Sequence, residues 1–430
     1  MKEVKELLGL KEKKIKIVDV TEEIIKGKKV KVVIIKGITN KVKCPICNKY
    51  TKSIHDELKP INLKYVKVAE NECRLKVIKR RFICHKCKKK ITEDLELNNR
   101  KRTITNNLEI KIRKDLLKAN FNIKQISEDN GISEDKVRKI LIEATEGESK
   151  YITRLPAIIS IDEFKADTNE GKYACIINDP IKKKPLDVLP KRTKEYLIKY
   201  FLRIENKSNV KIVIGDMYET YLVITKEMFP NAKYVVDRFH FTRYIMDAVD
   251  NIRIRKQKEF GYNSKEYKIL KNKKNVSLLR KYSNEIDWYV YVTRYQGNRK
   301  VKKLPINIIN EIFDISDEIY RGYQLKEMFL DIIKHAEYDN VKEQLLAWCD
   351  LCDESKIQEF IDASNTIENW IDNITYSFLD KRYSNGYTEG LNNKIKVIKR
   401  NAYGYKNFYF FRLRILYILN GTLSGRSKKK

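Results

Sequence analysis

The sequence predicts a multidomain α/β protein whose mixed sheet is interrupted by a helical insertion. Two short apolar runs rich in β-branched residues, Ile158–Ile161 and Ile212–Ile214, have the composition of buried strands. Each run is followed by an aspartate, Asp162 directly and Asp216 after one glycine. Helical patterns alternate with these strands, and such alternation is typical of a sheet covered by helices. A late helical pattern opens with Glu389.

The elements of the central region follow one another in an order that narrows the fold. We expect strands at 157–161, 173–178, 186–189, 210–214 and 234–236, and helices at 194–205, at 218–228 and from about 239. Three strands followed by alternating helices and strands is the order of the ribonuclease-H-like fold. The helical run from 388 to about 400 would return to that sheet after the insertion.

Motifs and the expected strands and helices divide the chain into five predicted segments. They are an N-terminal zinc-binding domain (1–100), a helix-turn-helix domain (101–150), the first part of a ribonuclease-H-like catalytic domain (151–245), a helical insertion (246–370), and the last part of the catalytic domain with a basic tail (371–430).

The charge balance indicates a polyanionic partner. The chain of 430 residues carries 90 Lys and Arg against 58 Asp and Glu, a net charge of +32. A field of this sign attracts nucleic acid, although a lysine-rich, merely solvated surface is the alternative. The N-terminus has no apolar secretory segment, and the apolar stretch 408–419 is broken by Arg412 and Arg414. We therefore expect a cytoplasmic, nucleoid-associated protein with no membrane partner.

Two cysteine pairs have the spacing of a structural zinc site. Cys44 and Cys47 form one C-x2-C pair, and Cys84 and Cys87 form another. Four thiolates close a tetrahedral Zn²⁺ site and leave no open position for catalysis. The alternative is buried free thiols, which is the interpretation we favour for the isolated pair Cys349 and Cys352.

Residues 123–141 have the pattern of a helix-turn-helix. Gly131 would supply the tight turn, and Ser133 would cap the second helix. Lys136, Arg138 and Lys139 would then face DNA. An ordinary helical hairpin is the alternative.

Three acids suit metal-dependent phosphoryl transfer. Asp162, Asp216 and Glu389 could hold two Mg²⁺ (or Mn²⁺) ions about 4 Å apart. The alternative for each acid is an ordinary exposed carboxylate on the protein surface. Helical phase places a polar stripe beside Glu389 and an apolar face opposite it. The stripe comprises Asn392, Asn393, Lys396 and Arg400, and we predict that Asn393, Lys396 and Arg400 contact DNA.

These motifs together resemble the ISL3 family of bacterial insertion-sequence transposases, within the acidic-triad (DDE) superfamily. The similarity runs over nearly the whole chain. It rests on Cys44–Cys47, Arg80–Cys87, Ser160–Phe164, Gly215–Tyr218, Val236–His240 and, most specifically, Ser384–Asn392.

The resemblance implies a zinc-binding domain, a helix-turn-helix and a ribonuclease-H-like domain with a helical insertion. It implies Asp162, Asp216 and Glu389 as the metal-binding triad. His240 matches an Asp-x2-His signature after the fifth strand, which places it near the active site, with Asp237 as a reserve acid.

The expected activity is that of a DNA transposase. Such an enzyme binds the terminal inverted repeats of an insertion sequence, cleaves the strands and transfers them to target DNA. Its partners are double-stranded DNA, at the element ends and at the target, and a second copy of the chain in a homodimer or higher oligomer. The alternative is a non-catalytic DNA-binding regulator derived from a transposase.

Overall fold

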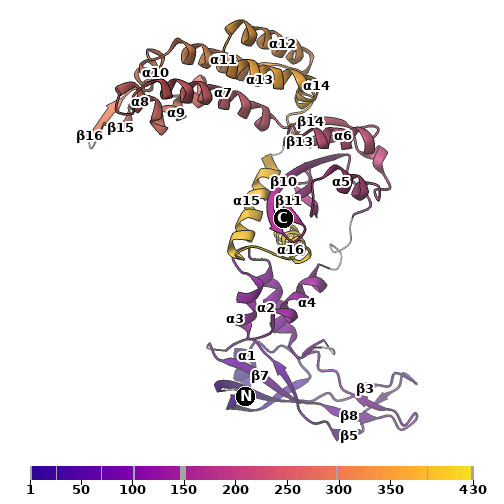
Figure 1. Ribbon diagram of the computed structural model, residues 1–430. Coiled ribbons are helices and arrows are strands. Elements are labelled where there is room, and N and C mark those ends of the chain that lie inside the picture. Colours follow the sequence, from indigo (N-terminus) through magenta and orange to yellow (C-terminus); the bar gives the residue numbers. More distant parts are fainter. Residues whose placement is uncertain are drawn as a thin grey trace. The chain divides into compact units, whose positions relative to one another are not determined.

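The computed structural model describes residues 2–25, 27–68, 70–99, 102–145, 152–296, 299–384 and 386–427 (Figure 1). The chain divides into two compact units. Unit 1 contains 1–150 and 394–430, and unit 2 contains 151–393.

Unit 1 contains a four-stranded sheet with one buried face. Its order is β1 (Ile15–Ile25), β2 (Lys28–Gly37), β7 (Glu72–Ile78) and β6 (Ile61–Lys64), and a short helix α1 (Lys2–Leu7) precedes it. Strands β2 and β7 are parallel, and the other neighbours are antiparallel. Burial alternates along β7, so that Cys73, Leu75 and Val77 face the core. Cys73 is therefore a core residue.

Two smaller sheets of unit 1 carry the predicted zinc ligands between their strands. One pairs β3 (Val42–Lys43) with β4 (Tyr50–Thr51). The other has the order β5 (Ile54–Glu57), β8 (Arg80–Ile83) and β9 (Lys90–Thr92). Cys44 and Cys47 lie between β3 and β4, and Cys84 and Cys87 lie between β8 and β9.

Four helices of unit 1 share a core. They are α2 (Asn106–Leu116), α3 (Ile123–Asn130), α4 (Glu134–Ala144) and α16 (Phe408–Ser427). Leu413 of α16 is fully buried among residues of α2, α3 and α4. Gly131 ends α3 in the left-handed conformation (φ 59°), as the turn requires. Ser133 stands at the N-cap position of α4, but its side chain makes no capping hydrogen bond.

Unit 2 contains a mixed five-stranded sheet. Its order is β12 (Lys184–Leu189), β11 (Gly171–Asp179), β10 (Ile158–Thr168), β13 (Ile212–Gly215) and β14 (Lys233–Val236). The first three strands are antiparallel, whereas β13 pairs in parallel with both β10 and β14. Helices α5 (Lys194–Phe201) and α6 (Glu219–Met228) connect the strands. The predicted mixed α/β order is confirmed.

The predicted insertion is largely helical. It comprises α7 (Arg238–Glu259), α8 (Lys265–Lys271), α9 (Lys273–Arg280), α10 (Pro305–Phe313), α11 (Asp317–His335), α12 (Tyr338–Ser355), α13 (Gln358–Asn369) and α14 (Ile371–Thr375). A hairpin of β15 (Val292–Gln296) and β16 (Arg299–Lys303) interrupts the helices. Figure 1 shows α11 and α13 lying beside α7, and α12 packs on α11 and α13. Cys349 and Cys352 are buried in the core between these helices, which agrees with the expectation of buried thiols.

A last long helix, α15 (Gly386–Asn401), follows the insertion. Among the residues that the structure describes, no helix is both long enough and apolar enough to cross a bilayer.

Candidate functional site

Three aspartates lie at the carboxyl ends of neighbouring parallel strand segments. The β10–β13 register ends with Ser160 opposite Ile214, so Asp162 and Asp216 each follow their paired residue by two positions. Gly215 pairs with Val236, which brings Asp237 level with Asp216. The Asp237 N–H donates to the Gly215 carbonyl over 2.9 Å. The carboxyl ends of parallel strands are the usual place for a ligand site in an open α/β sheet.

The electrostatics of this edge disfavour so many negative charges without a counterion. Burial, together with the nearby carboxylates of Asp216 and Asp237, raises the pKa of Asp162 to about 7. The Oδ1 atom of Asp216 is buried and has no hydrogen-bond partner. The Tyr234 hydroxyl donates to the Asp216 carbonyl over 2.6 Å, which fixes the backbone beside that orphaned oxygen.

Glu163 points away from this group, as strand alternation requires. Its carboxylate forms an ion pair with Arg192. The Arg192 guanidinium also lies over the rings of Tyr173, at 4.7 Å, and Tyr218, at 5.0 Å. Glu163 is thus committed to a separate ion pair.

The first turns of α15 are fastened to the sheet by polar side chains. Thr388 is fully buried, and its hydroxyl lies 3.1 Å from Ser160 Oγ and accepts from Asn178 Nδ2 over 3.2 Å. Asn392, one turn later, donates from Nδ2 to Asp162 Oδ2 over 2.8 Å. The other oxygen of Asp162 accepts from the Glu163 N–H over 2.7 Å. Helix α15 therefore holds one of the strand-end carboxylates directly.

The burial of Asn392 corrects its place in the predicted polar stripe. The packed face of α15 comprises Thr388, Leu391, Asn392, Ile395 and Ile398. Asn392 is only 8% exposed. Its hydrogen bond to Asp162 offsets the cost of burying a polar amide. Glu389, Asn393, Lys396 and Arg400 are exposed.

Glu389 is not drawn into a tight cluster with the aspartates. Within the described ranges, the four predicted zinc ligands are the sole group of at least three Cys, His, Asp or Glu residues whose ligand atoms all lie within 4.8 Å of one another. His240 is half-buried in the first turn of α7, where its ring meets that of Phe239 edge-on at 5.7 Å.

The predicted zinc ligands are brought together. Cys44, Cys47, Cys84 and Cys87 converge from the two turns, with Cys47 Sγ 3.7 Å from Cys84 Sγ. The Lys49 backbone N–H lowers the pKa of the Cys47 thiol to about 7. Four converging sulfur atoms, one of them readily ionised, fit a tetrahedral Zn²⁺ ion. His85 binds Ser53 Oγ instead, over 2.7 Å.

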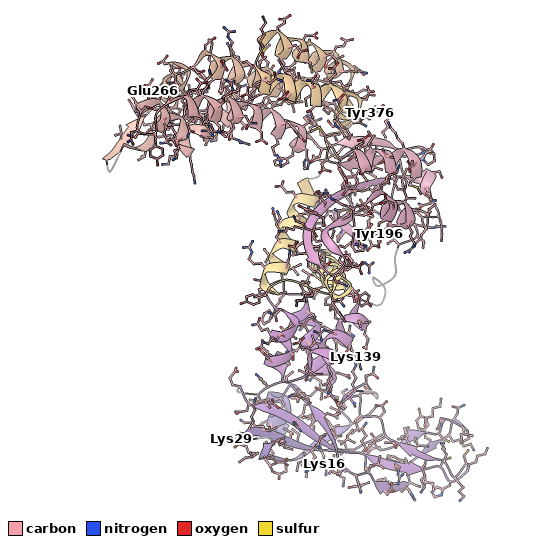
Figure 2. All side chains as sticks on the ribbon, in the orientation of Figure 1. Lys16, Lys29, Lys139, Tyr196, Glu266 and Tyr376 are labelled. Carbon is pink, nitrogen blue, oxygen red and sulfur yellow. The ribbon has the colours of Figure 1, made fainter. Side chains whose placement is uncertain are left out.

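The three basic residues of α4 that were predicted to contact DNA differ in how far they already pair with other side chains. Lys139 is exposed on α4 (Figure 2). Lys136 is exposed too, and its Nζ donates to Thr103 Oγ1 over 3.1 Å. The Arg138 guanidinium pairs with Glu134 at 2.6 Å and Asp135 at 3.0 Å, and lies 5.6 Å from the Phe410 ring centre. Its charge is already neutralised within unit 1.

Sequence reasoning missed the buried residues that support the acids. Ser160, Asn178 and Thr388 form the fastening, and no spacing rule marks them. One signal existed, because Thr388 and Asn392 are four residues apart and share a helix face with apolar Leu391 and Ile395. Asp237, the reserve acid, is 4% exposed and lies in the same electrostatic neighbourhood as Asp162.

Comparisons with known proteins agree with these features. A family model for transposases of the ISL3 type, described simply as a transposase, matches residues 159–415. The chain is 24% identical over 263 residues to the transposase for insertion sequence element IS1001 of Bordetella parapertussis, which covers 60% of this chain and 59% of that protein. It is also 36% identical over 110 residues to a Lactococcus lactis subsp. lactis protein named ATP-dependent protease, which covers 26% of this chain and 34% of that protein.

The chain thus spans about three fifths of the first relative and about a third of the second. The family model matches more than half of this chain, and the matched residues include all three predicted triad acids. The protein belongs to the ISL3 family of transposases.

Proposed function

We propose that the protein is a DNA transposase that binds the terminal inverted repeats of an insertion sequence and catalyses metal-dependent strand cleavage and strand transfer. One observation carries this proposal. Asp162 and Asp216 follow neighbouring positions of the parallel β10–β13 pair, where burial disfavours the charge of Asp162 and one carboxylate oxygen of Asp216 has no partner. A divalent cation would relieve both costs.

The sheet supports a ribonuclease-H-like catalytic domain. Three antiparallel strands, two further parallel strands and a later helix bearing an acid are the arrangement expected for that fold. We propose that it comprises 151–245 and the last segment from 371, that 246–370 is an insertion, and that 1–100 and 101–150 are zinc-binding and helix-turn-helix domains.

The proposed metal ligands are Asp162, Asp216 and Glu389. Bound Mg²⁺ or Mn²⁺ would activate the attacking oxygen and stabilise the leaving oxygen. Asp162 and Asp216 supply hard carboxylate oxygens on rigid strands, as such ions prefer. Glu389 lies on the exposed side of a helix that Thr388 and Asn392 fasten to the sheet. Two ions about 4 Å apart need carboxylates spread around them. The three acids can therefore lie further from one another than the four cysteines that would surround a single ion.

DNA binding is proposed for both units. The net charge of +32 supplies a general attraction for the duplex. Lys136, Lys139, Asn393, Lys396 and Arg400 are exposed and are proposed contacts. Arg138 is the weakest of the predicted contacts, because Glu134 and Asp135 already pair with it. A structural Zn²⁺ ion at the four cysteines would hold the module between β3 and β9. We also propose that two or more copies act together, on DNA of the nucleoid.

The test is strand transfer in vitro with Mg²⁺ or Mn²⁺, using a labelled duplex that contains the element end flanking the gene. Wild type should give joined products, and Asp162→Ala, Asp216→Ala and Glu389→Ala should each give none while still binding DNA. Glu227→Gln, on α6, is the matched control for loss of an acid and should retain activity. If wild type binds tightly and cleaves nothing, the protein is a DNA-binding regulator instead.

A further inference from the structure

A cavity in unit 1 has cationic walls drawn from two different parts of the chain. Its volume is about 300 Å³. Asn62 and Lys64 of β6 and Arg74 of β7 line one side. Thr103, Ser133 and Lys136 line the other, where the chain enters α2 and α4. The edge of the four-stranded sheet and the turn between α3 and α4 thus enclose one space.

The cations that line this cavity repel one another. Lys64 and Arg74 are direct partners on antiparallel strands. Like charges directly opposite each other destabilise a sheet. Glu72 offsets part of this repulsion, because its carboxylate lies 3.0 Å from Lys64 Nζ and its pKa is lowered chiefly by the hydrogen bond from Lys64. With Lys136 included, three cations face one carboxylate.

Arg74 still lacks a hydrogen-bond partner for part of its guanidinium. Its Nε atom is buried and donates to no acceptor. The neighbouring donors are already engaged, because Lys64 also donates to the Gly131 carbonyl and Lys136 donates to Thr103. The acids in the first turn of α4, Glu134 and Asp135, both pair with Arg138. The cavity therefore retains an excess of positive charge and an unsatisfied donor.

We propose that this cavity binds a backbone phosphate of DNA, with Arg74 as its principal ligand and Lys136 as a second. The proposal rests on the DNA-binding part of the proposed function and adds a contact that the helix-turn-helix alone does not provide. A phosphate oxygen at the accessible part of the Arg74 guanidinium would offset the repulsion between Arg74 and Lys64. Such a contact carries no base information; it fixes how the sheet and α4 sit on the duplex.

The experiment measures the affinity of the full-length protein for a fluorescent duplex of arbitrary sequence, between about 50 and 200 mM KCl. Each phosphate contact contributes about 0.9 to the slope of log K against log salt. Arg74→Met should make the slope shallower by about 0.9 and weaken binding on the order of tenfold at the lowest salt. Lys16→Met, an equal loss of charge on the far edge strand β1, should leave the slope unchanged.

A double variant tests whether one phosphate is shared. If Arg74 and Lys136 hold the same phosphate, Arg74→Met with Lys136→Met should lose a single contact and not two. A slope change of about 1.8 would mean separate phosphates and would overturn the shared site. Arg74→Lys keeps the charge and should keep most of the slope.

Folding serves as the internal control. Because Arg74→Met removes one of two opposed cations, its Tm should equal or exceed that of wild type. Inorganic phosphate is titrated in a separate arm; saturable phosphate binding with an unchanged DNA slope would identify a free-anion site and overturn the DNA contact. An unchanged slope in Arg74→Met, beside a wild type that still binds and joins DNA, refutes this cavity alone. A wild type with no salt-dependent DNA binding refutes the proposed function as well.

Discussion

At the scale of single residues, Asn392 departs most from the sequence prediction, because it is buried against Asp162 and not exposed to solvent. It holds Asp162 Oδ2 from the same helix that presents Glu389 one turn earlier. Groups that orient a metal-binding carboxylate usually contribute about 10- to 100-fold to affinity or activity. Asn392 is therefore a positioning residue for the proposed triad.

We predict that Asn392→Leu weakens Mn²⁺ binding and slows strand cleavage about 10- to 100-fold, with little change in DNA affinity. The apolar side chain leaves Asp162 Oδ2 without its donor but still fills the packed face of α15. Mn²⁺ binding can be followed by electron paramagnetic resonance, and Val397→Ala, at an exposed position of the same helix with no proposed contact, is the control. Normal Mn²⁺ affinity in Asn392→Leu would contradict the positioning role.

The sequence reveals the acids of the site more readily than the side chain that holds one of them in place. Asp162 and Asp216 were predicted because each acid follows a β-branched run that indicates a strand. The acid marks the end of the strand only at Asp216, since β10 continues past Asp162 to Thr168. Asn392 was assigned to the solvent side because a helical wheel places every polar residue there by default. Its burial depends on Asp162, which lies 230 positions away in the sequence, and only the fold supplies that partner.

At the scale of elements, we expect the hairpins around the four cysteines to depend on the proposed Zn²⁺ ion for their stability. The strands and turns of this module are short and expose large apolar residues, with Ile46 63%, Tyr50 62% and Ile54 51% exposed. A module that buries so little gains much of its folding free energy from metal–thiolate bonds, on the order of 10 kcal/mol in comparable small sites.

Cys84→Ser should lower the zinc content from one ion per chain to none and make the hairpins sensitive to protease. The neighbouring sheet of β1, β2, β7 and β6 should resist cleavage, because it has its own buried core. Elemental analysis and limited proteolysis measure the two effects. Cys352→Ser, in the core of the insertion, should keep its zinc, and full zinc in Cys84→Ser would contradict the assignment.

The helices of the insertion enclose a lysine whose charge depends on pH. Lys326 is fully buried, and its Nζ donates to the carbonyls of Leu279 at 3.0 Å and Lys281 at 2.6 Å. Burial lowers the pKa of Lys326 to about 8, against the opposing effect of Glu327. Between about pH 8 and 10.5 the unfolded chain binds this proton more tightly than the folded chain does.

It follows that Lys326 should make the protein more stable as pH rises from about 8 to 10.5, by at most a few kcal/mol. Lys326→Met lacks this titration, so the Tm difference between wild type and variant should move in favour of wild type over that range. Calorimetry of both proteins at several pH values gives the difference directly. A difference that stays constant with pH would show that Lys326 is charged throughout.

The sequence indicates the local turns in these elements clearly, but it does not indicate contacts between distant segments. The two C-x2-C pairs and Gly131 dictate turns through their own chemistry, so their positions could be predicted. The capping bond expected of Ser133 does not form, because capping residues only offer a hydrogen bond that the surroundings can leave unused. The hairpin of β15 and β16 was not predicted, although the dipeptide Gly297-Asn298 between two runs with β-branched residues is a sequence signal for a hairpin.

At the scale of the whole molecule, unit 1 is built from both ends of the sequence. Arg414 of α16 is fully buried and donates to the carbonyls of Lys118 at 2.9 Å and Phe121 at 2.7 Å, where α2 gives way to α3. Asn401 donates to the Ala119 carbonyl over 3.2 Å. The apolar stretch 408–419 is visible in the sequence, but the sequence carries no sign of which surface it covers.

Arg414→Ala should destabilise unit 1 by about 2 kcal/mol, because it removes the donor of two partly buried carbonyls and opens a cavity at a fully buried position. DNA affinity should fall with it, since α2, α3 and α4 lose their packing partner. Thermal unfolding and duplex binding are the measurements, and Lys406→Ala, exposed in the turn before α16, is the control. Unimpaired stability in Arg414→Ala would mean that α16 contributes little to this core.

The docking of α16 on α2 and α4 also sets the order of events on the ribosome. The first 150 residues emerge long before α16 is translated, so the proposed DNA-reading helices leave the exit tunnel with one face of their core uncovered. That face is closed only after synthesis has passed residue 420. A chain released early therefore carries the basic residues of α4 on an incomplete fold, and premature termination should yield substrates for proteases rather than competitors for the element ends.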